Sequence, residues 1–250
     1  MYTKVKTAEE IENMRIAGNM LATVLQHVKN RATAGMSTQD LADRAAAELK
    51  TLGGKPSFLG YEGFPDILCV SVNDEVVHGI PNKLNILEDG DIVSIDFGVT
   101  YKGMVTDAAL TFMVGNVDPK VAKLIKETER SMYAGIEQLK GGVRIGDVAS
   151  AIQKVLDAGG YGIVRDLVGH GVGHYLHEDP NIPNYGHAGS GDVLKAGMTI
   201  AIEPMATLGD YHVVMDDDGW TIRTKDRSLA AHFEHTILIT EKGYEILTQL

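Results

Sequence analysis

Apolar residues recur at spacings of three and four along residues 8–30, and this period predicts a long amphipathic helix. Thr7 and Glu10 have the spacing of a capping box, which places the start of this helix. A second helix of the same periodicity is predicted after Ser37, and the glycine pair 53–54 ends it. The chain therefore opens with two helices.

Beyond these helices, short apolar runs alternate with glycine and proline, which is typical of strands and turns. Strands are predicted near residues 69–72, 91–100, 104–114, 198–202 and 234–240. Two more helices are predicted, one opened by Asp118 and Pro119 and one over 147–157 that ends at the glycines 159–160. Helices and antiparallel strands together indicate an α+β, or mixed α/β, fold.

The second half of the chain echoes the first. The segments 35–42, 90–96 and 78–82 return in similar form at 142–149, 197–203 and 177–181. The spacing is far too long for a solenoid repeat. We interpret the chain as one domain over residues 1–250, whose halves, about 1–115 and 116–250, pack about a pseudo-twofold axis.

Composition and charge narrow the class of protein. The 250 residues are 44% hydrophobic, enough for a large core, and the net charge of −11 disfavours coating of nucleic acid or an anionic membrane. A single cysteine excludes an internal disulfide framework. The first residues lack a secretory signal, and no apolar run approaches the ~18 residues of a membrane helix. We expect a cytoplasmic protein without membrane or specific nucleic-acid partners.

Asp96 and Asp107 lie on two apolar strands that a tight turn connects. A turn over Thr100–Gly103 that pairs its two end residues places the two aspartates directly opposite each other. Opposed side chains have Cβ atoms ~4.5–5.5 Å apart, so two buried carboxylates there would repel and be costly to desolvate. The pair indicates either a protonated carboxyl group or a bound cation, unless the hairpin face is solvated.

Three more residues favour the cation. Glu203 and Glu234 flank apolar strands, and His170 lies among glycines that permit close approach of the backbone. If the halves share a cleft, Asp96 faces Glu203 across it. Four carboxylates and one imidazole suit two divalent ions such as Mn, Fe, Co or Zn, whose charges they balance. Two such ions ~3.5–4 Å apart activate water, so the set predicts metal-assisted hydrolysis.

Several segments resemble the type I methionine aminopeptidases. The matching motifs are PSFLGYEGFP at 56–65, CVSVNDEVVHGIP at 69–81, IDFG at 95–98, TDAALT at 106–111, GHGVG at 169–173, TIAIEPM at 199–205 and FEHT at 233–236. The resemblance spans nearly the whole chain. It implies the pita-bread fold, in which helices cover a central curved antiparallel sheet, and a short bacterial-type enzyme.

The resemblance also implies an activity and its ligands. The expected reaction removes the initiator methionine from nascent chains whose second residue is small, with a hydroxide that bridges the metals attacking the scissile carbonyl. The five matching ligands are Asp96, Asp107, His170, Glu203 and Glu234. Glu203 would also carry the proton, His177 would stabilise the tetrahedral intermediate, and His78 would contact the amide nitrogen.

By motif position, six residues would form the methionine pocket: Phe58, Tyr61, Phe64, Cys69, Leu176 and Trp220. Four positions depart from the usual family residues: many members carry Phe at Leu176, Gln at His232, Glu at Asp179 and a smaller residue at Phe58. None of these departures touches a ligand, so we expect them to change the shape of the pocket rather than the chemistry. The acidic run 216–218 is interpreted as an exposed turn.

Two alternatives share the fold: a proline-directed exopeptidase, and an inactive binding module. The first usually carries an extra N-terminal domain, for which few residues precede Asp96, and the second usually loses metal ligands. We expect a monomer whose partners are N-terminal methionines of nascent peptides, with at most a transient contact with the ribosome.

Overall fold

The computed structural model describes residues 3–250 and contains four α-helices in that range. The helices are α1 (Ala8–Arg31), α2 (Thr38–Leu52), α3 (Pro119–Ile136) and α4 (Ile145–Gly159). Thr7 and Glu10 form the predicted capping box, and Gly53 ends α2 in the left-handed conformation. The predicted helices are therefore confirmed, and each helix end that the sequence located lies within two residues of the observed one.

Every paired strand runs antiparallel to its partner. One sheet has the order β1-β4-β2, with β5 also paired to β4, and a five-stranded sheet has the order β15-β14-β9-β7-β8. Their strands are β1 (Lys55–Pro56), β2 (Leu68–Val72), β4 (Ile92–Tyr101), β5 (Met104–Met113), β7 (Gly169–Gly171), β8 (Glu178–Ile182), β9 (Thr199–Ile202), β14 (His235–Ile239) and β15 (Tyr244–Ile246).

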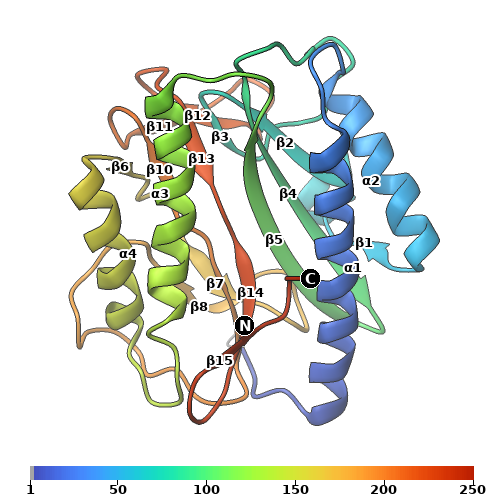
Figure 1. Cartoon of the computed structure of the whole chain (residues 1–250). Coiled ribbons are helices and arrows are strands. Elements are labelled where there is room, and N and C mark those ends of the chain that lie inside the picture. The colour runs from blue at the N-terminus through green and yellow to red at the C-terminus, as the bar shows by residue number, and fades with distance from the viewer. Residues whose placement is uncertain (1–2) are drawn as a thin grey trace.

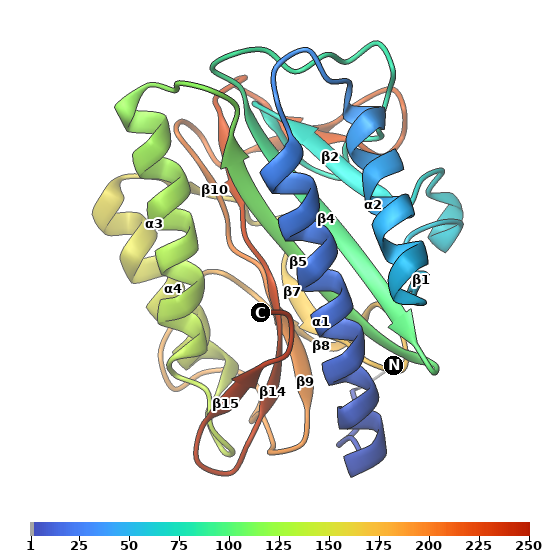
Figure 2. The same cartoon turned by 45° about the vertical axis from the view of Figure 1, so that its right-hand side comes forward.

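Two smaller sheets complete the fold, with orders β13-β10-β6 and β11-β12-β3. Their strands are β3 (Glu75–Val77), β6 (Gly162–Ile163), β10 (Met205–Thr207), β11 (Val213–Met215), β12 (Ile222–Thr224) and β13 (Ala230–His232), and a short 3-10 helix spans Tyr61–Gly63. Figure 1 and Figure 2 show α1 and α2 on one side of the molecule and α3 and α4 on the other. The predicted mixed fold is confirmed.

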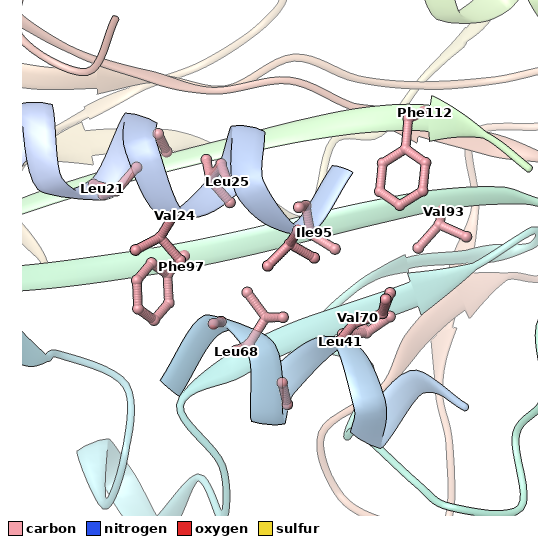
Figure 3. Packing of buried hydrophobic residues seen from close by; sticks show 14 of the residues in the cluster. Leu21, Val24, Leu25, Leu41, Leu68, Val70, Val93, Ile95, Phe97 and Phe112 are labelled. Carbon is pink, nitrogen blue, oxygen red and sulfur yellow. The ribbon is translucent and has the colours of Figure 1, made fainter. Parts of the chain in front are cut away.

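The hydrophobic core forms two large clusters. The first joins α1 and α2 to β2, β4 and β5, and Ile95 and Phe97 of β4 are fully buried in it (Figure 3). The second joins α3 and α4 to β9 and β14. The first cluster draws on residues 17–114 and the second on residues 124–239, so each belongs to one half of the chain. The pseudo-twofold axis and the single domain over residues 1–250 stay predictions.

The register of the β4–β5 hairpin differs from the prediction. Tyr101 pairs with Met104, so the turn has Lys102 and Gly103 at its centre, and both have positive φ, 46° and 81°. A two-residue turn of this type follows the natural twist of a hairpin, and glycine adopts the required conformation without strain. The expected pair of Thr100 with Gly103 is therefore wrong.

This shift changes the relation between the two aspartates. Asp96 pairs with Ala109 and Asp107 with Gly98, so the aspartates are diagonal neighbours on one face rather than directly opposed. Ile95 and Phe97 face α1 and α2, and side chains alternate along a strand, so Asp96 points to the opposite face. The hairpin thus presents two acids on the face that the helices leave free.

Candidate metal centre

The five predicted ligands converge from five strands or their ends. β4 supplies Asp96, β5 supplies Asp107 and β7 supplies His170, while Glu203 directly follows β9 and Glu234 directly precedes β14. Together they line one cavity of about 350 Å³. Residues that lie more than a hundred positions apart in the sequence therefore meet in one place.

The ligand atoms lie close enough to share an ion. One ligand atom each of Asp107, His170 and Glu234 lies within 4.8 Å of the other two. Nε2 of His170 is 3.4 Å from Oε1 of Glu203. Nδ1 of His170 lies 2.9 Å from the carbonyl oxygen of Gly171, an acceptor only, so Nδ1 carries the proton and Nε2 keeps its lone pair.

Burial shifts the titration of every member of this group. Desolvation raises the pKa of Asp96 to about 7. Desolvation, and then repulsion from neighbouring carboxylates, raises the pKa values of Asp107, Glu203 and Glu234 well above the usual range. Desolvation also lowers the pKa of His170 to about 3, so its imidazole is neutral. These carboxylates need positive charge nearby before they can all ionise.

The donor set fits divalent metal ions. Oδ1 of Asp96, Oδ1 of Asp107 and Oε1 of Glu234 are buried and have no hydrogen-bond partner within the described part of the chain. Buried acceptors without partners are costly, and hard oxygen donors beside one imidazole are ligands that Mn, Fe, Co and Zn accept. The structure thus provides a candidate metal-binding group of Asp, His and Glu.

Two further histidines border the ligands. The ring of His177 packs edge-on against the ring of His170, with centroids 4.5 Å apart, and its Nδ1 lies 2.9 Å from the hydroxyl of Tyr61. His78 lines the same cavity in a backbone conformation with φ of 60°. Desolvation lowers the pKa of both, that of His78 to about 4, so both imidazoles are neutral at pH 7.

Apolar side chains form another wall of the cavity. The six residues predicted for a pocket all line it: Phe58, Tyr61, Phe64, Cys69, Leu176 and Trp220. They also pack together, with the rings of Phe64 and Trp220 5.2 Å apart and those of Phe58 and Phe64 6.5 Å apart. The cavity therefore joins an apolar wall to a group of charged and imidazole side chains, as small-molecule sites commonly do.

The sequence analysis named His232 only as a departure that changes the shape of the pocket and touches no ligand, whereas the structure places it beside the predicted ligand Glu203. Its ring is buried and lines the cavity, neither ring nitrogen has a hydrogen-bond partner among the described residues, and Nε2 lies 3.8 Å from Oε2 of Glu203. The sequence contained a signal for this position: residues two apart on an extended segment face the same side, and His232 precedes the predicted ligand Glu234 by two residues. Leu167, Asn181 and Met205 also line the cavity without a sequence signal.

Comparison with known proteins shows which family the chain resembles. The model of metallopeptidase family M24 matches residues 12–241. A methionine aminopeptidase from Clostridium acetobutylicum is 46% identical over 244 residues, which cover 98% of each chain.

Solved structures agree with this match. The crystal structure of a methionine aminopeptidase from Thermotoga maritima superposes with a TM-score of 0.98 at 48% identity, covering 99% of this chain and all of that one. A prolidase from Pyrococcus furiosus superposes with a TM-score of 0.79 at 26% identity, and the match covers 98% of this chain but 65% of the prolidase. The fold is thus shared beyond one activity.

Proposed function

Starting from the fact that the chain belongs to metallopeptidase family M24, we propose that its five convergent ligands hold two divalent metal ions. The chain is a type I methionine aminopeptidase of bacterial size, a metalloenzyme that removes N-terminal methionine from peptides. The ligands are Asp96, Asp107, His170, Glu203 and Glu234. One observation supports the pair of ions above all: four carboxyl groups with raised pKa values line one cavity beside a neutral imidazole.

The donor atoms restrict the ions to a class of divalent metals but do not select one metal. Oxygen donors with one imidazole accept Mn, Fe, Co and Zn, and cellular supply selects among them. Ions at such a site supply an activated water molecule and polarise the carbonyl group of the substrate. Asp107 and Glu234 each have a ligand atom within 4.8 Å of one on His170, and they are the residues proposed to contribute to both ions.

Glu203 is proposed to move the proton. Its carboxylate lies between the imidazoles of His170 and His232, and burial and the charge of Asp96 raise its pKa, so an oxygen of the ionised carboxylate would accept a proton readily. That oxygen takes the proton of the attacking water and passes it to the leaving amine. This is general base and then general acid catalysis by one carboxyl group.

His177 is proposed to stabilise the negative charge that develops on the scissile carbonyl oxygen. When the hydroxyl of Tyr61 donates to Nδ1 at 2.9 Å, the proton of the neutral ring is on Nε2, which can then donate into the cavity. His78 is proposed to contact the amide nitrogen of the same bond. Both histidines thus hold the peptide bond beside the metal ligands.

The apolar wall is proposed to bind the methionine side chain. Phe58, Phe64, Leu176 and Trp220, with Tyr61 and Cys69, offer aromatic and thiol surfaces of the kind that thioethers favour. The enzyme is further proposed to act as a monomer in the cytoplasm on nascent chains with a small second residue, with at most transient ribosome contact. No helix within residues 3–250 is long and apolar enough to cross a membrane.

Release of methionine from the peptide Met-Ala-Ser tests the proposal. We expect release that a chelator abolishes and that Mn²⁺ or Co²⁺ restores, and we expect no release of the first residue from Ala-Pro-Ser, which does not begin with methionine. Asp96→Asn should lose at least one metal equivalent and most activity, whereas Asp43→Asn on the exposed side of α2 should lose neither. Proline-directed cleavage or an inactive, metal-free protein would support the alternatives, and full turnover by Asp96→Asn would refute the ligand assignment.

A further inference from the structure

Trp220 is held at the cavity by polar contacts that the proposed chemistry does not use. Its ring packs against Phe64, with centroids 5.2 Å apart, and against His78, with centroids 6.4 Å apart. Trp220 lies in the turn between β11 and β12, and its side chain is only half-buried. A large side chain on a turn keeps one orientation only if the turn itself is fixed.

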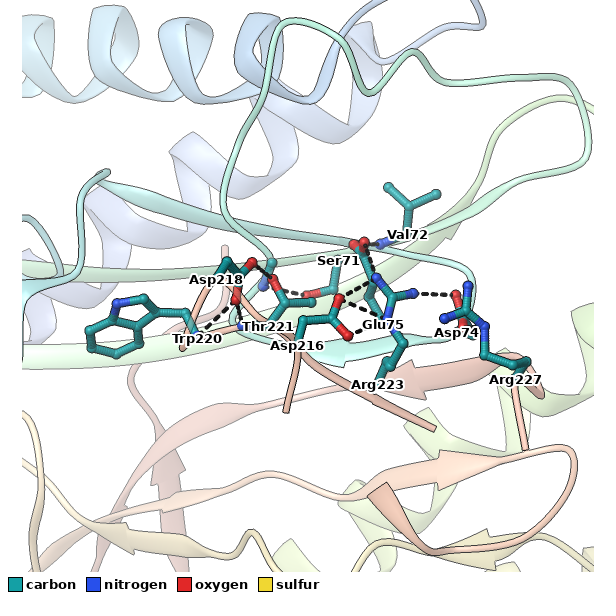
Figure 4. A network of polar contacts seen from close by, with 11 residues as sticks. Ser71, Val72, Asp74, Glu75, Asp216, Asp218, Trp220, Thr221, Arg223 and Arg227 are labelled. Carbon is teal, nitrogen blue, oxygen red and sulfur yellow. Dashed lines mark hydrogen bonds and ion pairs between the residues drawn. The ribbon is translucent and has the colours of Figure 1, made fainter. Parts of the chain in front are cut away.

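The carboxylate of Asp218 fixes this turn. Its Oδ1 accepts hydrogen bonds from the backbone N–H groups of Trp220 and Thr221, both at 2.8 Å, and its Oδ2 accepts one from the hydroxyl of Thr221 at 2.6 Å (Figure 4). Gly219 completes the turn with a φ of 78°. Asp218 thereby accepts hydrogen bonds from two consecutive backbone N–H groups and holds the turn at Trp220 in one conformation.

Arg223 connects this turn to the strand that leads to His78. Its Nε donates to Asp216 at 2.8 Å, at the start of the turn, while Nη1 donates to Asp74 at 2.9 Å and Nη2 to Glu75 at 3.3 Å (Figure 4). Glu75 begins β3, which pairs with β12 and ends directly before His78. The Arg223 side chain is 15% exposed, so solvent screens these contacts only in part.

We propose that Asp218 and Arg223 are positioning residues for the substrate pocket: Asp218 fixes Trp220 against Phe64, and Arg223 holds the Trp220 turn in register with His78. Asp218 acts on one wall of the pocket, whereas Arg223 acts on that wall and on a histidine beside the scissile bond. The acidic run 216–218 is therefore part of the site rather than an exposed turn alone. The assignment of a role in substrate binding rests on the proposed function.

Substitutions at Asp218 separate positioning from general stability. Asp218→Ala removes all three acceptor contacts, whereas Asp218→Asn keeps an oxygen for the two N–H groups. The matched control is Asp226→Ala, which removes three similar contacts, from Asp210 and Ser228, in a neighbouring exposed turn that does not line the cavity.

Tryptophan fluorescence and steady-state kinetics are measured on these variants. Trp220 is the single tryptophan of the chain, so its fluorescence emission and acrylamide quenching report this wall directly. For Asp218→Ala we expect emission at longer wavelength, stronger quenching and a KM for Met-Ala-Ser raised about tenfold, which corresponds to a loss of about 1.4 kcal/mol of binding free energy. We expect kcat within about twofold of wild type, because the methionine side chain is bound alike in ground and transition states.

Asp218→Asn and Asp226→Ala should match the wild type in emission and KM. Arg223→Lys, a second and independent variant, should shift the emission and also lower kcat, because one ammonium group cannot hold both strands as the guanidinium does. Wild-type emission, quenching and KM in Asp218→Ala, or an equal change in Asp226→Ala, would overturn the proposal. The fluorescence of the substrate-free enzyme needs no turnover, so an inactive wild type would count against the proposed function and leave this test intact.

Discussion

Replacement of Lys6 by methionine tests whether a buried ion pair holds the loop that carries His177. Nζ of Lys6 lies 3.2 Å from Oε2 of Glu178, and the two side chains are 0% and 2% exposed. The other oxygen of Glu178 accepts hydrogen bonds from the backbone N–H groups of His174 and Tyr175, at 2.7 and 3.0 Å. The segment before α1 thus fixes the loop on which His177 is presented to the metal ligands.

The magnitude follows from the burial of the pair. Without Lys6, the carboxylate of Glu178 is left buried and uncompensated, and loss of one partner of such a pair costs about 3–5 kcal/mol. The double variant Lys6→Met with Glu178→Gln removes the charge but keeps an oxygen for the two N–H groups. It should therefore recover at least half of the lost free energy of unfolding.

Urea denaturation measures these differences. The free energy of unfolding, extrapolated to water, is compared among wild type, both Lys6 variants and the matched control Arg15→Met. Arg15 also pairs with a glutamate, Glu245 at 2.7 Å, but these side chains are 43% and 37% exposed. Exposed pairs contribute about 0.2–1 kcal/mol, so the control should lose no more than that.

Turnover and metal content are measured on the same variants. Lys6→Met should lower kcat while the metal content stays near wild type, because the loop carries His177 and not a ligand. A loss of stability no larger than that of Arg15→Met, or a double variant as unstable as Lys6→Met, would refute the reasoning.

Three further outcomes are expected. His177→Ala should lower kcat about 10²–10³-fold with metal content intact, as for loss of a donor to a developing oxyanion, and equal loss of metal would make His177 a ligand instead. Asp96 should make the metal-free protein less stable as pH rises from 3.8 to about 7, because it binds its proton more tightly in the folded than in the unfolded chain. Urea titrations of wild type and Asp96→Asn at pH 5 and 8 after chelation isolate this contribution from that of the buried histidines, and the same pH dependence in both proteins would contradict it. Cys69→Ala should keep kcat/KM within about tenfold of wild type, because burial raises the pKa of the thiol and disfavours the thiolate nucleophile; abolished activity would contradict this.

Long periodic segments were predictable from the sequence. The apolar period and the capping residues locate α1 and α2 closely, because these signals act within one helix. Short strands such as β6 and β10 were not predicted, since two or three residues carry no period and their partners lie far along the chain. The register of the β4–β5 hairpin also depended on which two residues adopt positive φ, which the sequence pattern alone did not decide.

The candidate metal centre was also predictable from the sequence only in part. The five ligands were predicted because acids and a histidine beside apolar strands are costly to bury unless a cation pairs with them. All five line the cavity. The contact of His232 with Glu203 was missed because it forms only where different strands come together in the folded chain. The role of Asp218 was missed because an acidic run before a glycine also fits an exposed turn, and only the structure shows the Trp220 ring beside Phe64.

Metal content tests the central claim most directly, namely that the buried carboxylates are tolerated because divalent cations neutralise them. Elemental analysis of the purified chain, reconstituted with Mn²⁺ or Co²⁺ and freed of excess ion, counts the ions per chain while release of methionine from Met-Ala-Ser is followed. We expect two ions per chain, fewer in Asp107→Asn and Glu234→Gln, and activity that rises with occupancy. A metal-free chain that is fully active, or variants that keep both ions, would contradict it.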